Sequence, residues 1–115
     1  MLSYQRLDVY RCAIQFVSVC YGIAQKPPRG LAALTDQLRR AVISIPRNIA
    51  EGNGRAGIAD KARFFYSIAR GSAMESGAIL DVLAAVGVAD SAAAREASEL
   101  LVRIVEMLTK MTPVA

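Results

Sequence analysis

The chain contains no histidine and no tryptophan, and only two cysteines, Cys12 and Cys20, occur among its 115 residues. Without histidine, no mechanism can use an imidazole as general base, nucleophile or metal ligand. Two cysteines are too few for a disulfide scaffold or a four-cysteine zinc site. We therefore expect neither an enzyme nor a bound metal or cofactor.

Long apolar runs are also missing. No window of about 18 uncharged apolar residues occurs, so no membrane span is expected. Asp8 and Arg11 interrupt the first residues, which lack the continuous apolar segment of a secretory signal. Cys12 and Cys20 lie on one predicted helix, roughly 12 Å apart along its axis, which is too far for a disulfide. We interpret them as reduced core residues of a cytoplasmic protein.

Apolar side chains are abundant, at 54% of the chain, which is enough for the core of one domain spanning 1–115. Three breaks divide the chain into four segments, at 26–30, 52–57 and 87–90. Apolar residues recur at steps of three and four, which predicts helices at about 7–25, 36–51, 58–86 and 91–111. These four helices with short connections predict an all-α fold, an antiparallel up-and-down four-helix bundle.

The apolar spacing assigns a buried face to each predicted helix. The first face comprises Leu7, Tyr10, Ile14, Val17, Tyr21 and Ala24. The second comprises Leu38, Val42, Ile45 and Ile49. The third comprises Phe65, Ile68, Ser72, Glu75, Ile79, Val82 and Val86. The fourth comprises Ala94, Ala97, Leu101, Ile104, Leu108 and Met111.

The second predicted helix has recognisable ends and one interruption. Thr35 is expected as its N-cap, because a threonine hydroxyl can accept from a free amide of the first turn. Gly52 is expected to end the helix in a left-handed conformation. Pro46 lies inside and predicts a kink, because proline lacks a donor and presses on the carbonyl of Val42. The alternative is two short helices, but the apolar spacing continues through Ile49.

Polar residues border or interrupt the apolar faces of the second and third helices. An isolated buried carboxylate is very unfavourable, so Glu75 is expected to meet Arg39, Arg40 or Asn48. The expected contact is a structural network between the two helices or across a subunit interface. The alternative is a polar cleft that contacts a ligand or RNA. The candidate network comprises Gln37, Arg40, Ser44, Asn48, Glu51, Ser72 and Glu75.

Three glycines, Gly52, Gly54 and Gly57, match the pattern G-x-G-x-x-G. This pattern indicates dinucleotide binding only when it follows a strand within a βαβ unit. Here it follows a helix, so we interpret it as a flexible turn between helices. Backbone amides at the start of the next helix, beside Arg55, could still hold an anion.

The net charge of +4 is concentrated in the middle of the chain. A basic patch on the second and third helices would attract nucleic-acid phosphate without sequence specificity. The alternative is a solvated face that the acidic fourth helix balances. The candidate nucleic-acid-binding residues are Arg39, Arg40, Arg47, Arg55, Lys61, Arg63 and Arg70.

Two internal segments carry a family resemblance. The run 37–52, QLRRAVISIPRNIAEG, followed by Arg55, resembles the signature of the 23S rRNA intervening-sequence protein family. The run 65–72, FYSIARGS, followed by Glu75, resembles it as well, and the opening 7–10, LDVY, is similar to that family's first helix. The resemblance implies a four-helix bundle that assembles into a homopentameric ring. It also implies similarity to the accessory variability determinant of diversity-generating retroelements, a basic ring that binds a reverse transcriptase and nucleic acid.

The expected function follows from the charge and the resemblance together. We expect a non-enzymatic, oligomeric bundle protein that binds RNA or a ribonucleoprotein through the basic face of the second and third helices. Its expected partners are further copies of itself and RNA or a nucleic-acid-processing protein, with no membrane. The alternative is a structural or protein-interaction scaffold without a nucleic-acid role.

Overall fold

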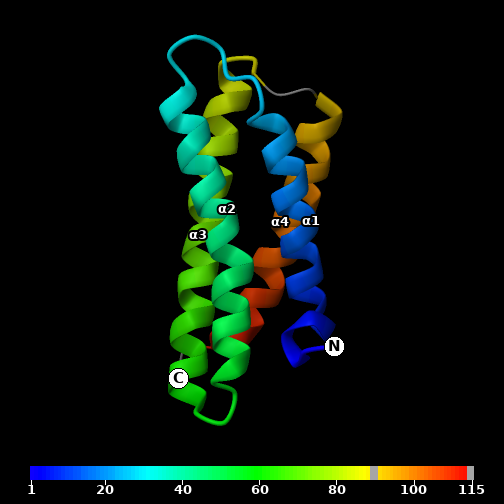
Figure 1. Cartoon of the computed structure of the whole chain (residues 1–115), viewed down its shortest axis with the longest axis vertical. Helices are drawn as coiled ribbons and strands as arrows, with labels where there is room; N and C mark the ends of the chain where they lie inside the picture. The colour runs from blue at the N-terminus through cyan, green and yellow to red at the C-terminus, as the bar shows by residue number, and fades with distance from the viewer. Residues whose placement is uncertain (89–90, 114–115) are drawn as a thin grey trace.

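The computed structural model describes residues 1–88 and 91–113, and it contains four α-helices and no strand in these ranges. A short 3₁₀ helix, η1 (Ser3–Arg6), precedes the first of them (Figure 1). The helices are α1 (Asp8–Ile23), α2 (Ala32–Gly54), α3 (Ala59–Ala85) and α4 (Ser91–Met111). The all-α four-helix bundle is therefore confirmed. None of the described helices is long and apolar enough to cross a membrane.

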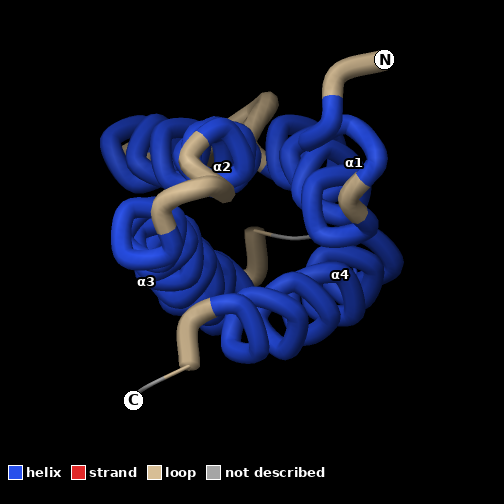
Figure 2. The backbone as a smooth tube through the Cα atoms, turned by 90° about the horizontal axis from the view of Figure 1, so that it is seen from below, coloured by secondary structure: helices blue, strands red, loops and turns tan. Residues whose placement is uncertain are grey.

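The helices stand at the four corners of the bundle (Figure 2). α1 packs against α2 and α4, and α3 packs against the same two helices, so α1 and α3 lie diagonally opposite each other. Consecutive helices run in opposite directions, which makes α1 and α3 parallel (Figure 1). The diagonal helices thus share only the central core.

The core is built around the apolar face of α2, which the sequence predicted correctly. Leu38, Val42, Ile45 and Ile49 are all fully buried. They meet Phe16 of α1 and Leu83 of α3, together with residues of α4, in one continuous cluster. The predicted face of α4 is also largely confirmed, because Ala97, Ile104 and Leu108 are buried.

The predicted buried face of α1 is only partly correct: Ala24 is buried, and Leu7, Tyr10 and Val17 pack against the core from partly buried positions. The residues that this helix buries are Val9, Cys12, Ala13, Phe16 and Cys20. Ile14 is instead 46% exposed and Tyr21 is 36% exposed. The helix carries apolar residues on two faces, so periodicity alone could not show which one enters the core.

The predicted face of α3 is also only partly correct: Ile79 is buried, but Ile68, Glu75, Val82 and Val86 are exposed. This helix buries a face of mostly small residues, Ala62, Tyr66, Ala69, Ala73, Ser76, Ile79 and Leu83. Ile68, Val82 and Val86 lie on the outside. The small side chains on the inner face allow α3 to approach its neighbours closely, and Tyr66, Ile79 and Leu83 are the large side chains that it buries.

Both expected ends of α2 are also wrong. Thr35 is buried inside the helix, where its hydroxyl donates to the Ala32 carbonyl oxygen at 3.0 Å. Gly52 is helical and buried, and the positive-φ glycines in the described ranges are Gly30 and Gly87. The helix continues through Pro46 as a single element, which rules out two short helices. The kink at Pro46 stays a prediction.

The two cysteines are free and buried in the core, as expected. Burial raises the pKa of the Cys20 thiol to about 12, because a thiolate would lose its hydration there. This thiol is therefore protonated and unreactive at neutral pH.

Candidate functional site

A small polar network joins α2 to α3 and contains three of the expected residues. Asn48 Nδ2 donates to the Ser44 carbonyl oxygen at 2.8 Å and to Ser44 Oγ at 3.0 Å. Ser72 Oγ on α3 donates to the same Ser44 Oγ at 2.8 Å. Ser76 adds a bond from its hydroxyl to the Ser72 carbonyl oxygen, one helical turn back. These groups satisfy one another between the helices.

The other members of the expected network do not join it. Glu75 is exposed, and among the described residues no cation lies within ion-pairing distance of it, so its expected burial and pairing within one chain are wrong. Gln37 and Arg40 are likewise exposed. Together with Glu75 they line an open groove of about 400 Å³ between α2 and α3. Ser72, three residues earlier, bonds Ser44 on α2, and Glu75 lies about one turn further along the same side of α3, where it faces this groove.

Three of the basic candidates, Arg39, Arg55 and Arg63, form an ion pair with an acidic residue three or four positions earlier in the chain. Arg55 Nε lies 4.0 Å from Glu51 Oε2, and its guanidinium stands over the Phe65 ring at 5.8 Å. Arg63 pairs with Asp60. Exposed pairs of this kind contribute little stability, but each acid offsets the positive charge beside it.

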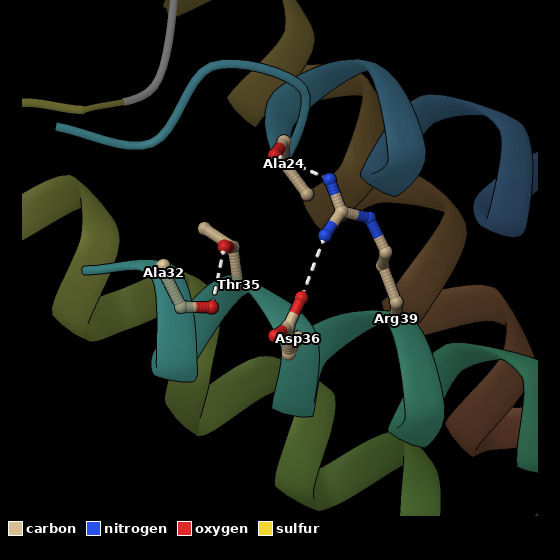
Figure 3. Close-up of polar contacts among 5 residues, drawn as sticks. All are labelled: Ala24, Ala32, Thr35, Asp36 and Arg39. Atoms are coloured by element: carbon tan, nitrogen blue, oxygen red, sulfur yellow. Dashed lines mark hydrogen bonds and ion pairs between the residues drawn. The ribbon is translucent and has the colours of Figure 1, made fainter.

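The side chain of Arg39 makes structural contacts and is not free on the surface. Nη1 donates to Asp36 Oδ1 at 2.9 Å, and Nη2 donates to the carbonyl oxygen of Ala24 at 2.8 Å (Figure 3). The guanidinium also stands over the Tyr21 ring at 5.8 Å. A carbonyl beyond the end of a helix has no partner within that helix, so Arg39 satisfies the end of α1 and ties it to α2.

We expect the substitution Arg39→Gln to lower the free energy of unfolding by about 1–2 kcal/mol, because the Ala24 carbonyl loses a charged donor. Chemical denaturation measures this change. The adjacent Arg40 is exposed and has no ion pair in the described ranges, so Arg40→Gln is the matched control, expected within about 0.5 kcal/mol of the parent. If the two substitutions lowered the free energy of unfolding equally, the structural role assigned to Arg39 would be wrong.

Arg70 lies on the side of α3 that faces α4. Its Nε donates to Thr109 Oγ1 on α4 at 3.0 Å. Arg63, two helical turns earlier, lies on the same side of α3. The expected single patch is therefore divided, because these two arginines are directed away from the α2 side of α3.

We call four of the basic candidates the basic stripe: Arg40 and Arg47 on α2, Arg55 just after this helix and Lys61 on α3. Arg40 and Arg47 are exposed and two turns apart, so they share one side of α2. Neither has an acidic partner within 4 Å among the described residues. Arg55 follows the last residue of α2, and the exposed Lys61 lies at the start of α3.

Asn53 is a contact residue that the sequence did not reveal. Its Oδ1 accepts a bond from the Ser3 hydroxyl, which attaches η1 to the end of α2. It also bonds the phenol of Tyr66, whose pKa is raised by burial against the opposing effect of this bond. No sequence spacing indicates such a contact, because the partners are far apart in the chain.

The four-helix bundle with its polar α2–α3 junction places the chain among the all-α bundle proteins. A comparison with known families then identifies its family. The family described as 23S rRNA-intervening sequence protein matches residues 5–110. The chain therefore belongs to this family. A comparison with curated proteins found no match.

Proposed function

We propose that this chain is a non-enzymatic bundle protein that self-associates and binds RNA through the basic stripe. The observation that carries the proposal is the pair Arg40 and Arg47, whose charges have no acidic partner among the described residues and share one side of α2. Positive side chains in such a row neutralise successive phosphates and bind without reading bases. The family is named for an intervening sequence of 23S rRNA, which agrees with an RNA ligand.

The chemistry of the side chains supports a binding role over a catalytic one. The chain has no histidine, and both of its thiols are in the core. The carboxylates Glu51 and Glu75 are exposed, without the burial that tunes a catalytic acid or base. Reduced, buried thiols also agree with a protein that acts in the cytoplasm.

Self-association is supported by the large apolar side chains that the single bundle leaves outside. Ile14, Ile43, Phe64 and Val82 are all exposed on α1, α2 and α3. Exposed apolar side chains that lie together on a helix face are typical of surfaces that contact another protein. The family resemblance favours a ring of five copies, and it favours a nucleic-acid-processing protein as a further partner.

The test measures the binding of a structured RNA by gel retardation at a series of salt concentrations. Each phosphate contact contributes about 0.7–0.9 to the slope of log affinity against log salt. The double substitution Arg40→Gln and Arg47→Gln should reduce that slope by about 1.4–1.8 per bound chain and weaken binding about tenfold at low salt.

The matched control is Arg103→Gln with Lys110→Gln, which removes the same charge from exposed positions on α4. We expect this control to keep nearly all of the RNA affinity and the slope of the parent. Equal losses in the two double variants would mean that only net charge matters, and the basic stripe would then not be the binding surface.

A scaffold without nucleic acid is the second candidate, because the exposed apolar residues suit protein contacts. It predicts that RNA is not retarded even at low salt, whereas the assembly persists. An oligomer that stays assembled but does not bind RNA in the titration would favour the scaffold function.

A further inference from the structure

Phe64 presents an aromatic ring to solvent near the start of α3, at the end of the bundle where α2 leads into α3 (Figure 1). It is 61% exposed, the largest exposed fraction among the large apolar side chains of this helix. Its ring meets the ring of Phe65 edge to face, with centroids 5.3 Å apart and planes at 81°. An edge-to-face contact covers at most one face of the Phe64 ring, so the other face is open to a flat partner.

A lysine and an isoleucine share the side of α3 that carries Phe64. Lys61 lies three residues before Phe64 and Ile68 four residues after it, so the three side chains are neighbours along the helix. Ile68 is 37% exposed. Lys61 is exposed as well, and no acid lies within 4 Å of it in the described ranges. A free positive charge therefore stands one helical turn from the open ring.

Arg47 brings a second cation to this place from α2. The two helices are antiparallel, and Ser72 bonds Ser44 across their junction. Arg47 comes three residues after Ser44, so it is level with the part of α3 that lies three residues before Ser72, next to Ile68. Arg47 also shares one side of α2 with Arg40, which lines the α2–α3 groove. We call these four residues the stacking platform: Lys61, Phe64, Ile68 and Arg47.

The acids of this region leave the cations of the platform free. Glu51 and Asp60, which lie near it, each form an ion pair with a different arginine. Glu75 lies about 16 Å further along α3 than Phe64. A negatively charged chain is therefore favoured at the end of the α2–α3 face that carries Phe64 and disfavoured at the end that carries Glu75.

An exposed aromatic ring beside cations is typical of proteins that bind single-stranded nucleic acid. An unpaired base lays its flat face on the ring, and lysine and arginine neutralise the phosphates on either side. A base inside a duplex is already paired and stacked on its neighbours, so it cannot reach a side chain in this way. The cations attract both forms of RNA, whereas the ring contributes only to the binding of the single strand.

We propose that Phe64 stacks on an unpaired base of RNA while Lys61 and Arg47 contact the adjacent phosphates, so that the chain prefers single-stranded RNA to duplex RNA. This inference rests on the RNA binding proposed above and specifies the form of RNA that the basic stripe receives. The preference requires no particular sequence, because every base has a flat face.

Fluorescence anisotropy tests the stacking with a short labelled RNA that cannot pair with itself and with the same strand annealed to its complement. Phe64→Ala on the full chain should weaken binding of the single strand by about 5- to 150-fold, the loss typical of one stacked base. Duplex binding should stay nearly unchanged. The slope of log affinity against log salt should also keep the value of the parent, because the substitution removes no charge.

Two further substitutions at the same position separate stacking from apolar contact. Phe64→Leu keeps an apolar side chain but has no ring, so it should lose most of the single-strand preference, whereas Phe64→Tyr should retain it. Val102→Ala is the matched control on α4, where the valine is 54% exposed, and it should change neither affinity.

Phe64→Trp gives a direct readout of the stacking, because the chain has no tryptophan of its own. A base stacked on an indole quenches its fluorescence, so the single strand should quench this variant and the duplex should not. Val102→Trp is the matched control, and neither RNA should quench it.

Three outcomes would overturn the proposal in different ways. If Phe64→Ala lost single-strand and duplex affinity equally, or lost neither, the stacking would be wrong and RNA binding through the basic stripe would remain. If the parent bound neither RNA at low salt, the proposed RNA-binding function would be wrong, and the stacking with it. If Phe64→Ala had a lower mass than the parent by light scattering without RNA, Phe64 would be covered by another copy of the chain and not by RNA.

Discussion

Phe16→Ala is expected to lower the free energy of unfolding by about 3–5 kcal/mol. Phe16 is fully buried on α1 and belongs to the central cluster that includes Leu38 and Ile45 of α2. Removing the ring loses its burial and leaves a cavity that rigid neighbouring helices cannot close. Small domains have about 5–15 kcal/mol of stability in total, so the variant loses a large part of it. Urea denaturation followed by circular dichroism measures the change.

Phe64→Ala is the matched control, because it removes the same ring from the outside of α3. At concentrations low enough to keep the chain monomeric, it should change the free energy of unfolding by less than about 0.5 kcal/mol. Similar losses at the two positions would contradict the assignment of Phe16 to the core and of Phe64 to the surface.

Gly52→Ala is expected to destabilise the bundle by about 1–3 kcal/mol, although alanine is normally the better helix former. A Cβ at position 52 would lie 2.5 Å from Tyr66 Cε1 and 2.8 Å from Cδ1. The Tyr66 ring is buried between α2 and α3 and cannot move without displacing its neighbours. The substitution therefore pushes the two helices apart at this level, and thermal or urea unfolding measures the loss.

Gly54→Ala provides the control within the last turn of the same helix. Nothing lies near its added Cβ, so the variant should be neutral or more stable by up to about 1 kcal/mol. The double variant Gly52→Ala with Tyr66→Ala should lose less than the sum of its single losses, because the clash is gone. If Gly52→Ala behaved like Gly54→Ala, the close contact of α2 and α3 would be wrong.

The sequence predicted α2 and α4 better than α1 and α3, for a physical reason. Leu38, Val42, Ile45 and Ile49 are the large apolar residues that recur along α2, and the core is formed around them. On α3 several large residues, such as Phe64 and Ile68, are outside, whereas the small Ala69 and Ala73 face the core. Periodicity marks every apolar face alike, so a helix with two such faces gives no sign of which one its own chain buries.

The candidate site was predicted in composition but not in arrangement. Ser44, Asn48 and Ser72 come together because steps of four on α2 place two of them opposite the third on α3. The positions of charged residues in the sequence do not show where their side chains point. The hydrogen bond from Arg39 to the Ala24 carbonyl oxygen and the contact of Arg70 with α4 therefore could not be predicted. Those roles depend on how the helices pack, which periodicity does not specify.

Light scattering of the purified full chain, eluted at low salt with and without a structured RNA, tests the central claim most directly. The account predicts a mass several times the 12.3 kDa of one chain without RNA, and a heavier complex that contains RNA when it is added. It also predicts that the complex dissociates as salt rises, because phosphate contacts carry the binding. A 12.3 kDa species that elutes separately from RNA at low salt would contradict it.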